Sequence, residues 1–192
     1  ERPLIYAGGG VITAEASVQL TELAEKADIP VVSTLMNLGA ISRKHPLSLG
    51  MVGMHGQKEA NQAVHNSDLL ITIGARFSDR VTGDVNHFAK NAVIAQIDID
   101  ESEIDKNVVV DLSLIGDMRE ILSRLLEKTE KKKNPVWLEK IDSFRVPKAI
   151  SEDAFVPQNI FKVIHEVLGD DVIVATDVGQ HQMWTAQEWP FT

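Results

Sequence analysis

Short apolar runs alternate with segments of helical period along most of this chain, and no other feature restricts the fold as strongly. Apolar runs of strand length occur at 3–7, 29–34, 69–73 and 92–99, with a short fifth run at 112–114. The run 69–73 is rich in apolar residues, as in strands that are buried on both faces. Strands that alternate with helices predict an α/β fold built on a parallel sheet.

Helices are predicted where apolar residues return every three or four positions. One helix ends near Ala27, and another is predicted to begin at Asp117. Asp100, followed three residues later by Glu103, has the pattern of a capping box and predicts a further helix start. The segment 37–56 is rich in Gly, Ser and His and is predicted to be a long loop.

The character of the chain changes near Thr129, where polar and basic residues replace the periodic pattern. We therefore divide the chain into a first domain at 1–133, a linker at 134–156 and a second unit at 157–192. Asn134, directly before a proline, is predicted to cap a short helix within the linker.

The second unit begins with a helix that is predicted to start at Pro157 and to end at Gly169. The apolar run 171–176 then predicts another buried strand. A helix and a strand alone cannot bury their apolar faces. We therefore expect 157–192 to be the start of a second α/β domain that is incomplete in this sequence.

Composition disfavours several classes of protein. The 192 residues carry a net charge of −9, which argues against nonspecific nucleic-acid binding, and the basic run 131–133 is interpreted as a solvated helix end. No cysteine is present, so disulfides and thiolate metal sites are excluded, as suits the cytoplasm. No apolar run is long enough to span a membrane, and no targeting peptide is visible.

Special residues follow the predicted strands, at the end where a parallel sheet binds its ligands. Gly8, Gly9 and Gly10 follow the first strand and suit either a tight turn or close approach to a phosphate. The dinucleotide fingerprint fails, because its third glycine position is Thr13 and the second strand ends at Thr34 instead of an acid. The pattern argues against a typical nicotinamide site and leaves room for another nucleotide.

Further candidates follow the later strands. The segment 53–56 suits a backbone that wraps a flat ligand. The segment 74–80 contains two arginines and an aspartate, which form either a structural ion pair or a group that holds an anion. Asp98 and Asp117 each suit either a ribose hydroxyl or a helix cap. The histidines lack zinc-ligand spacing and no nucleophile turn is present, so we predict a binding site without a catalytic centre of its own.

Seven motifs occur along the chain in a characteristic order. Two are specific in combination: Arg-Phe-Ser-Asp-Arg-Val-Thr-Gly at 76–83 and Gly-Gln-His-Gln-Met-Trp at 179–184. The others are Tyr-Ala-Gly-Gly-Gly at 6–10, Ile-Pro-Val-Val-Ser-Thr-Leu at 29–35, Gly-Met-His-Gly at 53–56, Ser-Asp-Leu-Leu at 67–70 and Ile-Asp-Ile-Asp at 97–100. Together they resemble the large catalytic subunits of the acetolactate (acetohydroxyacid) synthase family, over the chain from end to end.

The resemblance implies a Rossmann-like central domain that holds FAD, between a pyrimidine-binding domain and a diphosphate-binding domain. By matching motif, the FAD contacts would be Gly9, Thr34, Leu35, Val52, Gly53, Met54, His55, Gly74, Ala75, Arg76, Phe77, Ser78, Asp98, Ile99, Asp117 and Met118. Gly179, Gln180 and His181 match a loop that contacts thiamine diphosphate, and Asp79 and Arg80 match residues of the substrate channel. Family members often carry Leu at position 52, and plant members carry Asp at position 78, where a backbone contact is expected here.

The reaction that the resemblance implies is the decarboxylation of pyruvate and the transfer of its two-carbon unit to a second 2-oxo acid, pyruvate or 2-oxobutanoate, in branched-chain amino-acid biosynthesis. The flavin is expected to be structural, because the net reaction is not a redox one. The glutamate that activates the thiamine ring and the segment that binds Mg²⁺ are expected outside this sequence. The chain alone is therefore expected to be inactive. A homo-oligomer and a regulatory small subunit are the implied partners.

Two other interpretations stay open. The candidate site would also suit a free-standing nucleotide-binding module without catalysis, although such a module would not end on an incomplete α/β layer. A related carboligase, a pyruvate oxidase or a decarboxylase would share the architecture and single motifs.

Overall fold

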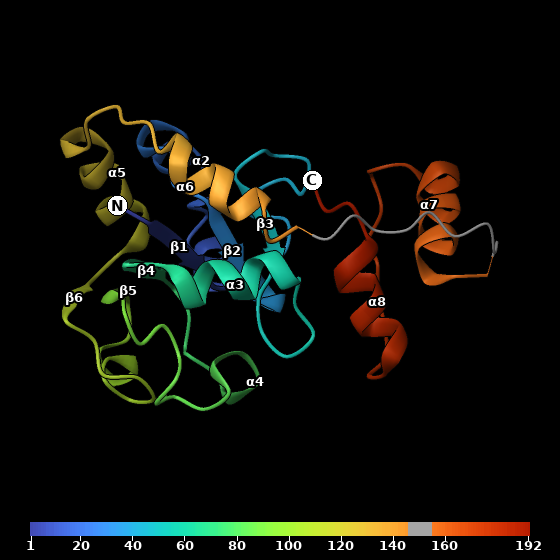
Figure 1. The fold of residues 1–192 in the computed structure, drawn as a ribbon. Helices are drawn as coiled ribbons and strands as arrows, with labels where there is room; N and C mark the ends of the chain where they lie inside the picture. The colour runs from blue at the N-terminus through green and yellow to red at the C-terminus, as the bar shows by residue number, and fades with distance from the viewer. Residues whose placement is uncertain (146–154) are drawn as a thin grey trace.

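A computed structural model describes residues 1–145 and 155–192. Its centre is a six-stranded sheet with the order β3-β2-β1-β4-β5-β6, in which every neighbouring pair is parallel (Figure 1). The strands are β1 (Pro3–Ala7), β2 (Val31–Ser33), β3 (Ser48–Met51), β4 (Leu69–Ile73), β5 (Val93–Asp98) and β6 (Leu112–Ile115). The strand order reverses between β1 and β4, as in doubly wound α/β folds. The predicted α/β fold with a parallel sheet is confirmed.

Five of the six strands coincide with the predicted apolar runs, and one does not. β3 lies inside the segment 37–56, which the sequence predicts to be a loop, so that prediction is wrong in part. Ser48 and Gly50 alternate with Leu49 and Met51 in this strand, and they interrupt the apolar signal. The strand forms because it can pair with β2, which no local pattern reveals.

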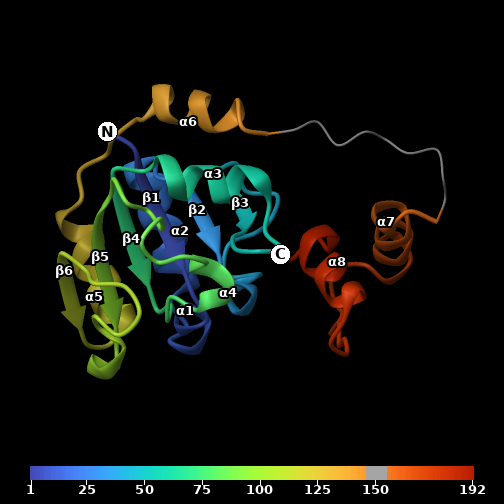
Figure 2. The ribbon, with the colours of Figure 1, turned by 60° about the horizontal axis from the view of Figure 1, so that its bottom comes forward.

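One face of the sheet is covered by α2 (Ser17–Ala27) and α5 (Met118–Lys128), with the short α1 (Gly10–Thr13) beside them (Figures 1 and 2). Leu20, Leu23 and Ala24 of α2 are buried, so its apolar stripe faces the sheet. They belong to a core that also contains Ile5 and Ile73 of the central strands.

The opposite face is covered by α3 (Lys58–Asn66) and α6 (Pro135–Asp142) (Figure 2). Trp137 and Ile141 of α6 are buried in a core that contains Leu4 and Tyr6 of β1. The Trp137 indole N–H donates to the Pro3 carbonyl at 2.8 Å, which joins α6 to the first strand. The helix predicted after Asn134 is therefore confirmed, and it packs on the sheet.

The cap predicted for α6 is wrong, because the Asn134 side chain makes no capping bond. Its amide Nδ2 donates instead to the carbonyls of Ala27 and Asp28, both at 3.0 Å. Asp28 ends α2 in the left-handed conformation and accepts from the Asn134 N–H at 2.7 Å. Asn134 thus holds the start of α6 against the end of α2 instead of capping its own helix.

The helix start predicted at Asp100 is confirmed with Asp100 as its cap, but the capping box is not, because the Asp100 side chain bonds at Ser102 and not at Glu103. Asp100 begins a 3₁₀ turn, η2 (Glu101–Glu103), and its carboxylate accepts from the N–H of Ser102 at 2.9 Å. A second 3₁₀ turn, η1 (Leu35–Asn37), and the short helix α4 (Asp79–Thr82) follow β2 and β4.

The remaining elements are α7 (Pro157–Leu168) and α8 (Gln180–Glu188). The predicted limits of α7 at Pro157 and Gly169 are confirmed. The strand predicted at 171–176 is absent, and Ile173 is fully exposed. A strand needs a hydrogen-bonded neighbour, and none of the described strands lies against this segment. Residues 146–154 of the predicted linker lie outside the described residues.

Candidate functional site

The loops after β1 and β4 meet where the strand order reverses, which is where doubly wound sheets bind their ligands. The Gly8 N–H donates to the Ile73 carbonyl at 2.8 Å, and the Gly10 N–H donates to the Gly74 carbonyl at 3.1 Å. A Cβ at Gly8 would lie 2.2 Å from the Gly74 oxygen. Gly8 and Gly10 are therefore required by this close backbone approach, in agreement with the turn interpretation. Gly9 faces the Met36 side chain instead.

The residues matched to FAD contacts all lie at the carboxyl edge of the sheet (Figure 2). Each of the six strands contributes at least one of them: Gly9 after β1, Thr34 and Leu35 after β2, Val52 to His55 after β3, Gly74 to Ser78 after β4, Asp98 and Ile99 at the end of β5, and Asp117 and Met118 after β6. Neighbouring strands are separated by about 4.8 Å, so this row extends over roughly 24 Å. An elongated ligand suits such a row better than a compact one.

The loop after β4 is held in an unusual conformation. Phe77 has a φ of 49°, which is rare for a bulky residue, and its ring is buried. The ring stacks on Tyr6 with centroids 5.7 Å apart and meets Phe88 edge-on at the same distance. This packing fixes the main chain. The backbone N–H groups of Ala75, Arg76 and Phe77 donate to no acceptor among the described residues.

Arg76 presents a free cation beside this loop. Its side chain is exposed, and it forms no ion pair within residues 1–145 and 155–192. Hydrogen bonds from Ser102 lower the pKa of Asp100, with smaller contributions from the charges of Lys106 and Arg76. The structural ion pair considered for 74–80 is not observed in the described residues. An arginine without a carboxylate partner at a ligand edge can hold an anion.

Asp79 and Arg80 begin α4 and are exposed. Ser78 caps α4, with its hydroxyl oxygen accepting from the Arg80 N–H at 3.3 Å, and the Asp79 carboxylate accepts from the same N–H at 2.8 Å. The Arg80 carbonyl accepts from the N–H of Met54 at 3.0 Å, which places this turn against the loop after β3.

The loop after β3 is fixed by Asn61 of α3. The Gly53 N–H donates to the Asn61 side-chain oxygen, and the Asn61 amide returns a bond to the Gly53 carbonyl, both at 2.9 Å. Gly53 has a φ of 111°, which only glycine adopts without strain. Val52 is buried, while Met54 and His55 expose their side chains to solvent. The two exposed side chains are free to contact a ligand.

The two aspartates differ in role. The Asp117 carboxylate accepts from the Glu120 N–H at 2.9 Å, so its interpretation as a helix cap is confirmed. Asp98 is buried, and one of its oxygens accepts from the Asp100 N–H at 3.1 Å. Met118 is buried beneath Gly74, where its methyl group would lie 2.7 Å from an added Cβ.

The residues matched to thiamine diphosphate lie at the amino end of α8. Gly179 precedes the helix, and Gln180 and His181 are exposed in its first turn. The other end of α8 contacts the loop after β3, through the Gln187 side chain and the His55 carbonyl. Arg43, Gln57 and Gln187 form this contact, and the sequence analysis missed them because they belong to no motif and no periodic pattern.

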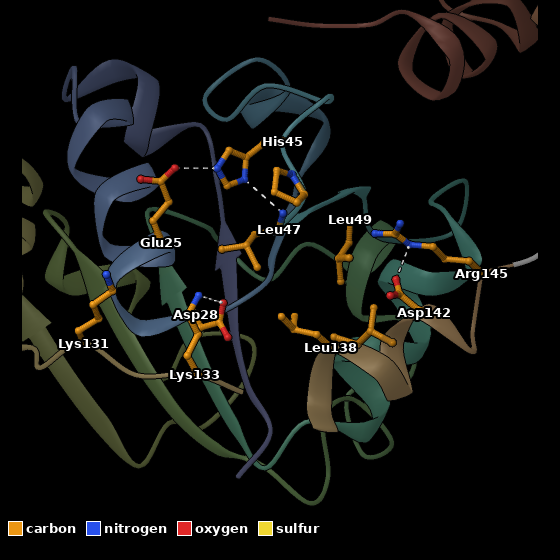
Figure 3. Close-up of a pocket in the computed structure, with 12 residues that line it drawn as sticks. Glu25, Asp28, His45, Leu47, Leu49, Lys131, Lys133, Leu138, Asp142 and Arg145 are labelled. Atoms are coloured by element: carbon orange, nitrogen blue, oxygen red, sulfur yellow. Dashed lines mark hydrogen bonds and ion pairs between the residues drawn. The ribbon is translucent and has the colours of Figure 1, made fainter. Parts of the chain in front are cut away.

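A cavity of about 550 Å³ lies near the amino ends of the strands, away from the predicted site (Figure 3). Its charged groups are mostly paired with one another: His45 with Glu25 at 3.1 Å, Lys133 with Asp28 at 3.4 Å, and Arg145 with Asp142 at 3.4 Å. Leu47, Leu49, Leu138 and Ile141 supply apolar wall. Because these charged side chains already bond to one another, we interpret the cavity as a structural feature and not as a ligand site.

No group of three or more His, Asp or Glu side chains among the described residues could hold a metal ion. No helix in the described ranges is both long and apolar enough to cross a bilayer.

The family model described as thiamine pyrophosphate enzyme, central domain, matches residues 1–125. The chain belongs to this family. The match covers the whole sheet and most of α5. The resemblance to thiamine-diphosphate enzymes is thus confirmed for the part of the chain that contains the candidate site.

Curated relatives extend the similarity to nearly the whole chain. The probable acetolactate synthase large subunit of Methanocaldococcus jannaschii is 48% identical over 97% of this chain and 34% of its own length. The acetolactate synthase large subunit of Corynebacterium glutamicum is 45% identical, over 97% of the chain and 32% of its own length. The acetolactate synthase isozyme 1 large subunit of Escherichia coli is 40% identical over 99% of this chain and 34% of its own length. The chain therefore spans about a third of the length of these relatives.

Proposed function

We propose that this chain is the central part of an acetolactate synthase large subunit and that it binds FAD along the carboxyl edge of its sheet. The observation that carries the proposal is the row of matched residues, to which all six strands contribute. Relatives named as acetolactate synthase large subunits support the assignment to this enzyme.

The chemistry of the edge fits a flavin dinucleotide. Arg76 and the N–H groups of Ala75 to Phe77 are donors without protein acceptors in the described residues, and they suit the diphosphate oxygens. Gly9 lies directly after β1 at the start of α1 and is partly exposed. The carboxylate of Asp98 lies at the end of β5 and suits a ribose hydroxyl. The extended row matches an extended cofactor.

The whole protein would decarboxylate pyruvate and join the two-carbon unit to a second 2-oxo acid. Bound thiamine diphosphate would supply the carbanion chemistry of that reaction, with Mg²⁺ held by residues outside this sequence. In this chain, Gly179, Gln180 and His181 would contact thiamine diphosphate, and Asp79 and Arg80 would line the path of the 2-oxo acid. The flavin would hold the loops of the edge in place. The chain alone would therefore be inactive.

We assign residues 1–133 to the FAD domain, 134–156 to a linker whose helix α6 packs on that domain, and 157–192 to the start of the diphosphate-binding domain. Helix α7 supports the last assignment, because it has no buried residue and exposes Val163, Val167 and Leu168. Such an apolar face is typical of a helix that packs against further structure. It argues against a free-standing nucleotide-binding module.

The whole enzyme is proposed to be a cytoplasmic homo-oligomer with a regulatory small subunit. The large-subunit names of the relatives support a partner subunit.

The test is the FAD affinity of the full-length protein after Arg76→Ala. A hydrogen bond to a charged group contributes about 1.5–3 kcal/mol. We expect the affinity, measured by flavin fluorescence titration, to fall on the order of tenfold to a hundredfold. Arg76→Lys should lose less, because it keeps the charge without the planar fork.

Arg145→Ala is the matched control, because Arg145 lies at the cavity near the amino ends. It should leave the FAD affinity unchanged. An unchanged affinity in Arg76→Ala would refute the assignment of the site.

A further inference from the structure

Helix α8 is capped at its carboxyl end by side chains from the sheet domain. The last carbonyls of a helix have no partner within the helix. Here the Ala186 carbonyl accepts from the Arg43 guanidinium, and the Gln187 carbonyl accepts from the Gln57 amide, both at 3.4 Å. Beyond the helix, the Phe191 carbonyl accepts from the Arg43 N–H at 2.9 Å. The end of α8 is therefore fixed on the β3 side of the sheet (Figure 1).

Arg43 contributes charge as well as hydrogen bonds. Burial lowers the pKa of its guanidinium, and the nearby carboxylates of Glu188 and Glu59 oppose that shift. A cation at a helix carboxyl terminus also interacts favourably with the helix dipole. Trp189, directly after α8, is buried, so the contact has an apolar component too.

Two glutamines connect α8 to the loop after β3. The Gln57 side-chain oxygen accepts from the Met51 N–H at 2.8 Å, while its amide nitrogen donates to Gln187. The Gln187 amide in turn donates to the His55 carbonyl at 2.7 Å. The loop matched to the flavin is thus bonded directly to the helix whose first turn is matched to thiamine diphosphate.

We infer that Gln187, supported by Gln57, couples the two cofactor sites, so that FAD and thiamine diphosphate each raise the affinity for the other. The inference rests on the proposed function of the two sites. FAD at the loop 52–55 fixes the main chain that carries the His55 carbonyl. Gln187 transmits this constraint on the loop to α8. The opposite end of α8 carries the residues 179–181 that are matched to thiamine diphosphate. Gln187 is a positioning residue in this account, because it touches neither cofactor.

Coupling of this kind is reciprocal and has a definite size. If FAD raises the affinity for thiamine diphosphate by a factor, thiamine diphosphate must raise the affinity for FAD by the same factor. Most such couplings lie between about fivefold and 150-fold. Because few hydrogen bonds carry this one, we expect a factor on the order of tenfold.

The experiment measures four dissociation constants in the full-length protein: each cofactor with the other absent and with the other saturating. Gln187→Glu keeps the size of the side chain but replaces the donor to His55 with an acceptor. Gln187→Leu removes the polar group. In both variants the coupling factor should fall close to one, while each cofactor still binds when it is alone.

Gln62→Leu is the matched control, because Gln62 lies on α3 near Gln57 but its side chain has no hydrogen bond among the described residues. It should keep the wild-type coupling factor. A wild type that binds both cofactors independently, or Gln187 variants that keep the full coupling, would overturn the inference. A wild type that binds no FAD would instead refute the proposed function, and the inference with it.

Discussion

At the scale of single residues, the carboxyl edge depends on how closely two loops approach. Gly8 and Gly74 bring their main chains together, and Phe77 adopts a left-handed φ that its ring contacts with Tyr6 and Phe88 stabilise. The loop is therefore shaped before any ligand arrives. A preformed loop loses less conformational entropy when it binds a cofactor.

Gly8→Ala tests this approach. The added Cβ would lie 2.2 Å from the Gly74 oxygen, and a backbone atom cannot move aside as a flexible side chain can. We expect the free energy of unfolding to fall by about 3 kcal/mol, in the upper range for overpacking. The measurement is urea denaturation of the protein without cofactor.

Gly9→Ala serves as the control for that substitution. Its Cβ would lie 3.0 Å from the Met36 Cβ and 3.3 Å from the Met36 carbonyl oxygen, so the turn that carries Met36 needs to shift far less than Gly74 would for Gly8→Ala. The loss should therefore be smaller than for Gly8→Ala. Equal stability of Gly8→Ala and the wild type would contradict the close approach.

The sequence predicted the candidate edge better than its internal contacts. Strand ends can be located from apolar runs, so Arg76, Asp98 and Asp117 could be assigned to one edge in advance. The conformation of Phe77 could not, because a positive φ at a bulky residue arises from tertiary packing. Arg43 bonds to Ala186, and Gln187 bonds to His55, and only the folded chain brings these partners, far apart in sequence, together.

At the scale of elements, a segment forms a strand only where a neighbouring strand is available to hydrogen-bond with it. β3 forms despite its serine and glycine, because β2 supplies a hydrogen-bonded neighbour. The apolar segment 171–176 has no such neighbour in the described residues and forms no strand. Local apolar pattern predicts a strand correctly only when the rest of the sheet is available.

Helix α6 shows how one contact joins an element to the fold. Trp137→Phe keeps most of the buried ring but removes the donor to the Pro3 carbonyl. We expect a loss of about 1–2 kcal/mol in the free energy of unfolding, because the partly buried Pro3 carbonyl is left without this donor. Chemical denaturation measures this loss.

The exposed neighbour Val136 provides the control on the same helix. Val136→Ala should change the stability by less than about 0.5 kcal/mol, because Val136 is mostly exposed. If Trp137→Phe is as stable as Val136→Ala, the hydrogen bond does not hold α6 in place.

At the scale of the whole molecule, the two ends of the strands have different roles. The carboxyl edge carries the residues matched to FAD, together with donors that have no acceptor among the described residues. Near the amino ends, the cavity is lined mostly by paired charges and by α6. Helix α8 contacts the carboxyl side through the loop after β3, so the length of α8 connects the two proposed cofactor segments.

Hydrogen–deuterium exchange of the full-length protein, with and without FAD, tests this division most directly. FAD should slow exchange in the loops after all six strands, including 52–55, 74–78 and 117–118, because a bound ligand stabilises the closed form of the segments that it contacts. Exchange around the cavity at 45–49 should stay the same. Unchanged exchange at the carboxyl edge, or protection confined to 45–49, would contradict the proposed site.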